Sequence, residues 1–202
     1  MKKILLTLSM TLLVMVGFSQ AKVELGIKGG LNLANIDTKN AMATYNSRTG
    51  YHAGLYAIAK VASFGIQPEI LYSVRGTELS TTIGTAKQDF KQDFVYLDIP
   101  IMLKLYTVAG LNLQAGPQFG VLMSVDGKIS DGAGGTTTIS KDSYKNADTS
   151  IALGAGWDAP FGLNLTARYV IGLSDINDGG GSEAKNRTFQ VAAGIKLFRA
   201  GK

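Results

Sequence analysis

The stretch VELGIKGGLNL, residues 23–33, alternates strictly between two kinds of side chain. Its odd-numbered positions carry Val, Leu, Ile or Gly, and its even-numbered positions carry charged residues, Asn or Gly. Successive side chains of a β-strand point to opposite faces, so the stretch predicts a strand with one apolar and one polar face. Which face meets water depends on the class of protein.

The composition narrows that class. A chain of 202 residues suits one domain with a substantial core. Its formal charge of +5 includes Lys2 and Lys3, and without them 18 basic residues face 15 acidic ones, a net +3. A net positive charge this small predicts no nucleic-acid partner. The absence of Cys excludes disulfides, thiol catalysis and a lipoprotein anchor.

The N-terminus has the pattern of a secretory signal peptide. Met1-Lys2-Lys3 precedes the apolar run ILLTLSMTLLVMVGF, and Ser19-Gln20-Ala21 places small residues where signal peptidase reads them. The run falls short of the roughly 20 residues of a spanning helix, which disfavours a membrane anchor. We predict a signal peptide at residues 1–21 and one barrel domain at residues 22–202.

Seven more segments alternate as the first does: 55–59, 64–72, 95–105, 111–121, 151–157, 163–173 and 189–197. Their polar faces carry charges and amides, unlike the core of a soluble sandwich. Eight such strands fit either a soluble lipocalin-like barrel with an apolar interior or an outer-membrane barrel with an apolar exterior.

The lengths of the connections separate these two architectures. Long polar segments at 34–49, 76–93, 125–149 and 174–187 alternate with tight turns at VASF, TVAG and APFG. Long loops at one rim and short turns at the other are typical of outer-membrane barrels. The predicted fold is therefore all-β: an eight-stranded antiparallel up-and-down transmembrane barrel in the outer membrane, with both termini periplasmic and the apolar faces toward lipid.

The segments GIKGGLNLANI, QPEILYSVRGTEL, YLDIPIMLKLY, LQAGPQFGVLMS, LNLTARYVIGLSDI and TFQVAAGIKLF resemble the successive strands of porin-family outer-membrane β-barrels, in particular small OmpA/OmpX-like ones. The resemblance implies outer-membrane lipid and the barrel-assembly machinery as partners. Such chains usually end on an aromatic residue that this machinery reads. Here RAGK follows Phe198, which makes Phe198 the candidate assembly signal.

Charged residues on the inward faces form the candidate site. An eight-stranded barrel has an interior just wide enough for side chains to fill, and unpaired charges there are costly. These charges either line a narrow channel or pair into a network that plugs the lumen, and the diameter favours the plug. The predicted lumen charge network consists of Glu24, Lys28, Lys60, Glu69, Arg75, Asp98, Lys104, Asp158, Arg168 and Lys196.

Catalytic, cofactor and metal sites are not expected. The single His52 has Ser47 and Tyr51 near it in sequence, but no orienting carboxylate can be identified, so we interpret it as a polar residue at the long-loop rim. The acidic loop SDINDGGGSE, residues 174–183, fails the EF-hand spacing. Three functions remain: a structural or interaction barrel meeting a surface ligand, which the long loops favour, a narrow pore for small solutes, and a lipid-modifying enzyme.

Overall fold

The computed structural model describes residues 22–38, 44–83, 86–130, 136–138, 147–174 and 184–201, so the predicted signal peptide lies outside the described residues. Within them lie a 3-10 turn at Val108–Gly110 and the strands β1 (Lys22–Thr38), β2 (Thr44–Val61), β3 (Phe64–Ile83), β4 (Ala86–Tyr106), β5 (Leu111–Ser130), β6 (Thr136–Thr138), β7 (Ala147–Asp158), β8 (Leu163–Gly172) and β9 (Ala184–Ala200). Across these same ranges, no helix has the length and apolar character needed to cross a membrane.

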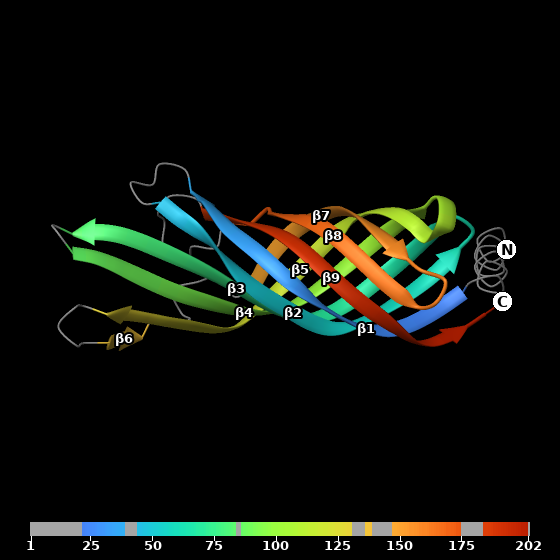
Figure 1. Cartoon of the computed structure of the whole chain (residues 1–202), viewed down its shortest axis with the longest axis horizontal. Helices are drawn as coiled ribbons and strands as arrows, with labels where there is room; N and C mark the ends of the chain where they lie inside the picture. The colour runs from blue at the N-terminus through green and yellow to red at the C-terminus, as the bar shows by residue number, and fades with distance from the viewer. Residues whose placement is uncertain are drawn as a thin grey trace, which may run out of the picture.

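The strands form a closed antiparallel barrel (Figure 1). Sheet order runs β4-β3-β2-β1-β9-β8-β7-β5, and β4 also pairs with β5, so eight strands close on themselves while the short β6 pairs with β5 at one end. On β1, Ile27 lies opposite Leu55 of β2 on one side and opposite Ile195 of β9 on the other. The predicted eight-stranded all-β barrel is confirmed.

The two faces of the wall have the polarity predicted for a membrane barrel. Outward-facing Leu55 and Leu113 are each 59% exposed, whereas inward-facing Asp98 and Lys104 are 0% and 1% exposed. A soluble protein would bury the leucines and expose the charges. The apolar face of each strand therefore surrounds the barrel, as a band that meets lipid does.

Short turns gather at one end of the barrel, which we call the short-turn end. They lie between β2 and β3, between β4 and β5, and between β7 and β8. Positive φ angles at Ala62, Ala109, Gly110 and Gly162 let the chain reverse within these few residues. The start of β1 and the end of β9 lie at the same end (Figure 1).

At the opposite end, strands replace much of the predicted loops. The segment 76–93, predicted as a long loop, is instead a hairpin that stays in register as far as Ile83 opposite Ala86. The predicted loops 34–49, 125–149 and 174–187 likewise contain the ends of β1, β2, β5, β7 and β9. The apolar alternation weakens along most of these extensions, and backbone pairing with a neighbouring strand holds them as strands.

Pro68, Pro100 and Pro117 lie on the adjacent strands β3, β4 and β5. At each proline, the residue-by-residue pairing with the preceding strand of the wall is interrupted. The pairing with the following strand includes the proline. Proline has no N–H to donate, so each interruption falls where a ladder bond would be missing. The prolines are therefore accommodated within the wall rather than at a frayed rim.

A register shift between β4 and β5 lies beside Val95, whose burial was not predicted. Val95 was predicted to face outward, but it is only 7% exposed. Ser124 lies opposite Val95 and Leu122 lies opposite Tyr96, so Met123 is an extra residue on β5. The bulge reverses the inward parity of β5, so that Val125 is buried beyond Leu122, but it leaves β4 unchanged, since Phe94 and Tyr96 on either side of Val95 are both buried.

Candidate functional site

The centre of the lumen holds an ion-paired group formed by Lys28, Glu69 and Arg168, which we call the central triad. Arg168 Nη1 lies 2.9 Å from Glu69 Oε2, and Nη2 lies 2.5 Å from Oε1, so the pair is bidentate. Lys28 Nζ lies 3.2 Å from the same carboxylate. Glu69 is on β3 and Arg168 is on β8, four strands apart in the eight-stranded order, so their bond spans the lumen from wall to wall.

Amides and a hydroxyl complete the surroundings of the central triad. Gln67 donates to Glu69 Oε1 at 2.5 Å, and Arg168 Nε donates to Gln114 Oε1 at 3.0 Å. Lys28 Nζ also donates to Thr166 Oγ1 at 3.4 Å. The three charged side chains are at most 2% exposed, and charges so buried persist only when paired and hydrogen-bonded.

A second triad, formed by Arg75, Asp98 and Asp148, lies farther from the short-turn end. Arg75 Nη2 contacts both carboxylate oxygens of Asp98 at 2.8 and 2.6 Å, and Nη1 lies 3.1 Å from Asp148 Oδ2. The Arg75 guanidinium also lies 4.7 Å from the centre of the Tyr96 ring. Formal charges are +1 for the central triad and −1 for the second triad, so the two groups balance along the lumen.

Neutral polar side chains fill the space between the two triads. The Asn32 amide oxygen lies 2.8 Å from His52 Nδ1 and accepts a bond from Gln190 at 3.1 Å. The Asn32 amide nitrogen donates to Ser73 Oγ at 2.9 Å. His52 was predicted at the rim, which is wrong: β2 begins at Thr44, so His52 lies inside the barrel and is 3% exposed. Its Asn32 partner is an amide, whereas a catalytic triad needs an orienting carboxylate.

An apolar cluster lies beyond the second triad. It consists of Phe94, Tyr96, Leu122 and Val125, each at most 8% exposed. The rings of Phe94 and Tyr96 stack with centroids 6.5 Å apart. Since β4 and β5 contribute these residues on the side away from their short turn, the cluster covers the polar interior toward the extended hairpins.

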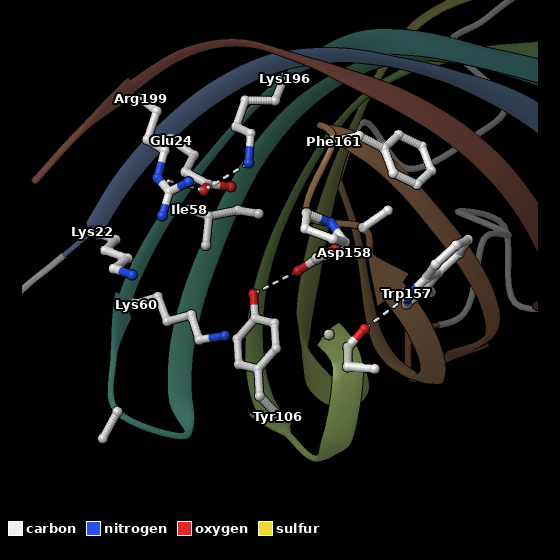
Figure 2. Close-up of a pocket in the computed structure, with 15 residues that line it drawn as sticks. Lys22, Glu24, Ile58, Lys60, Tyr106, Trp157, Asp158, Phe161, Lys196 and Arg199 are labelled. Carbon is white, nitrogen blue, oxygen red and sulfur yellow. Dashed lines mark hydrogen bonds and ion pairs between the residues drawn. The ribbon is translucent and has the colours of Figure 1, made fainter. Parts of the chain in front are cut away.

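A third ionic group lies near the short-turn end. Lys104 Nζ contacts both oxygens of Asp158 at 3.0 and 2.8 Å. The Tyr106 hydroxyl donates to Asp158 Oδ2 at 2.6 Å (Figure 2). Asn164 also donates to Asp158. Outside this group, Lys196 pairs with Glu24 at 2.9 Å at the mouth of the barrel.

The structure brings the predicted lumen charges together in these groups, with one exception. Lys60 lies over the Tyr106 ring, 3.5 Å from its centre, rather than against a carboxylate of the described residues. Sequence reasoning missed Asp148, because it fell in a segment taken as a loop. Extending the alternation of 151–157 backwards by three residues would have placed it inward.

Phe198 lies on the outer face of β9, opposite Leu25, and is 56% exposed. Its role as an assembly signal stays a prediction. Among the residues that the structure describes, no three His, Asp or Glu side chains are grouped to hold a metal ion. The oxygen-bearing residues Asp175, Asn177 and Asp178 of the loop at 174–183 lie outside that part of the chain.

Comparison with known proteins agrees with this architecture. Neisserial surface protein A is similar in structure, with a TM-score of 0.50 and 10% identity over 86% of this chain and 97% of that one. Ail, the attachment invasion locus protein of Yersinia pestis, has a TM-score of 0.51 and 15% identity over 88% of this chain and 99% of its own. At these identities the likeness shows the fold alone.

No curated protein sequence matches the chain significantly. The model of the family described as outer membrane protein beta-barrel domain matches residues 18–178, which is most of the chain. An apolar exterior that faces lipid and a polar lumen are the features expected of a barrel in the outer membrane. The chain therefore belongs to the outer membrane protein β-barrel family.

Proposed function

We propose that this protein is a closed, non-enzymatic barrel that anchors extended strands at the cell surface, where they serve a structural or interaction role. The observation that carries the proposal is the bidentate bond between Glu69 and Arg168, which crosses the full width of the lumen. A bond between opposite walls occupies the path that a solute would take.

The side chains above the central triad in the lumen also support a closed barrel. The second triad ties β3 to β4 and β7, and the apolar cluster formed by Phe94, Tyr96, Leu122 and Val125 covers it. Transfer of a hydrated solute through this region would require separating buried ion pairs, which is strongly unfavourable. An eight-stranded barrel offers little room to bypass them.

The extended hairpin supports a role at the surface. β3 and β4 have 20 and 21 residues, whereas a tilted strand crosses a bilayer with about 9–11 residues. Their hairpin projects from the end opposite the short turns (Figure 1). With the termini in the periplasm, as predicted, this hairpin stands outside the cell, where a surface ligand can reach it.

The test of the closed barrel is conductance in planar lipid bilayers. The wild-type protein is expected to show no steady conductance, whereas Arg168→Ser is expected to open small, flickering events because it removes one side of the central bond. Lys196→Ser removes a positive charge at the mouth and serves as the matched control, with conductance unchanged. Steady wild-type currents large enough to pass sugars would replace this proposal with a pore.

The barrel-assembly machinery is proposed as a partner through the end of β9. Phe198→Ala is expected to lower the amount of folded protein in the outer membrane several-fold, because it removes the aromatic side chain nearest the end of the strand. The readout is the heat-modifiable band in cell envelopes. Phe189→Ala, which alters an outward phenylalanine at the other end of β9, is the control. Equal losses in both variants would argue against a signal at Phe198.

A further inference from the structure

A cavity of about 620 Å³ opens at the short-turn end of the barrel. Its charged lining consists of Lys22, Glu24, Lys60, Asp158, Lys196 and Arg199, and the side chains of Ile58 and Tyr106 supply apolar wall (Figure 2). Four of the six charged groups are cationic. The cavity therefore carries a formal charge of +2, and it is separate from the bond that closes the lumen.

Both carboxylates of the cavity are already engaged. Glu24 Oε1 accepts a hydrogen bond from Lys196 Nζ at 2.9 Å and lies 3.6 Å from Arg199 Nε. Asp158 holds Lys104 at 2.8 Å and the Tyr106 hydroxyl at 2.6 Å. No described carboxylate forms an ion pair with Lys22 or Lys60, so these two ammonium groups are uncompensated, while Lys196 and Arg199 share Glu24.

The wall places these two lysines directly against each other. Lys22 on β1 lies opposite Lys60 on β2 in the antiparallel ladder, and both line the cavity. Like charges directly opposite on one face of a sheet are destabilising. Tyr106 holds the Lys60 ammonium 3.5 Å from its ring centre, which positions the charge at the cavity wall. An anion between the lysines would relieve their repulsion.

We propose that this cavity binds a phosphate monoester group between Lys22 and Lys60, with Arg199 at its rim. A phosphate monoester carries about −1.5 to −2 charges at pH 7, which matches the two uncompensated lysines. Its oxygens accept the ammonium and guanidinium donors. Ile58 and the edge of Tyr106 provide a surface for the organic part of the ligand.

Two sources share this chemistry. One is a soluble phosphate in the periplasm, and the other is the headgroup of phosphatidic acid in the adjacent leaflet. The apolar wall beside the lysines would favour the lipid, because it contacts more than the phosphate. The two sources are separated by comparing inorganic phosphate with a short-chain phosphatidic acid.

The experiment is isothermal titration calorimetry on the full-length folded protein in non-ionic detergent micelles. The titrants are inorganic phosphate, dihexanoyl phosphatidic acid and, as the ligand control, dihexanoyl phosphatidylcholine. Wild-type protein is expected to bind inorganic phosphate, phosphatidic acid or both, but not the phosphatidylcholine. Lys22→Gln and Lys60→Gln are each expected to weaken binding about tenfold, which corresponds to the loss of one charge-assisted hydrogen bond.

Two further variants separate recognition from general charge and from folding. Lys60→Arg keeps the cation and should retain binding, while Lys91→Gln removes one lysine from the distant β3–β4 hairpin and should leave affinity unchanged. Tighter binding of phosphatidic acid identifies the lipid source, and equal binding identifies the soluble one. The proposal is overturned if wild-type protein binds neither probe, or if the Lys22→Gln/Lys60→Gln double variant binds as wild type while remaining folded.

Discussion

Replacing Glu69 by Gln is expected to lower the free energy of unfolding by about 3–5 kcal/mol. Gln keeps nearly the same shape, but it removes the only carboxylate of the central triad and leaves Lys28 and Arg168 facing each other inside the barrel. Both cations are at most 2% exposed, so water cannot replace the lost charge. The penalty comes from uncompensated buried charge rather than from lost packing.

Reversible urea unfolding in lipid vesicles measures this effect, and Glu24→Gln is the matched control. Glu24 makes the same kind of pair with Lys196, but both side chains are partly accessible, at 17% and 16%. Water at the mouth should limit the cost of that change to about 1 kcal/mol or less. Similar losses for both variants would show that the central triad is not an isolated, water-excluded network.

Replacing Leu55 by Arg is expected to cost about 2–4 kcal/mol, because it places a charge on the lipid-facing wall at mid-depth. Leu55 lies six residues from the end of β2 at the short-turn end and is 59% exposed on the outer face. In detergent-free vesicles its neighbours are acyl chains. These chains cannot solvate a guanidinium group.

Val61→Arg tests the depth dependence on the same strand and the same face. Val61 is the last residue of β2, next to the short turn, and its outward side chain is 41% exposed. An arginine there reaches the headgroups, so the expected cost is about 0–1 kcal/mol. Unfolding in vesicles compares the two variants directly. Equal costs would place the bilayer at a different height on the barrel.

Alternation along single strands predicts an all-β barrel, and the lengths of the connections then distinguish a membrane barrel from a soluble one. The pattern of residues 23–33 recurs in every wall strand, and facing depends only on the parity of neighbouring residues, which is a local property. The short turns at VASF, TVAG and APFG then order the strands as antiparallel neighbours. Parity fails on β5 beyond Leu122, where the extra residue Met123 turns Val125 inward.

Parity along a strand predicts which charged side chains point into the lumen. It does not predict which of them form ion pairs with each other. Glu69 and Arg168 are 99 residues apart in sequence and lie on opposite walls, so their meeting depends on the stagger of all the strands between them. Lys60 has the same inward parity as the paired lysines, yet its ammonium group lies on the Tyr106 ring at the cavity wall. Barrel closure fixes the height and angle of each side chain within the lumen. Pairing is therefore a consequence of three-dimensional register, and alternation along one strand carries no information about it.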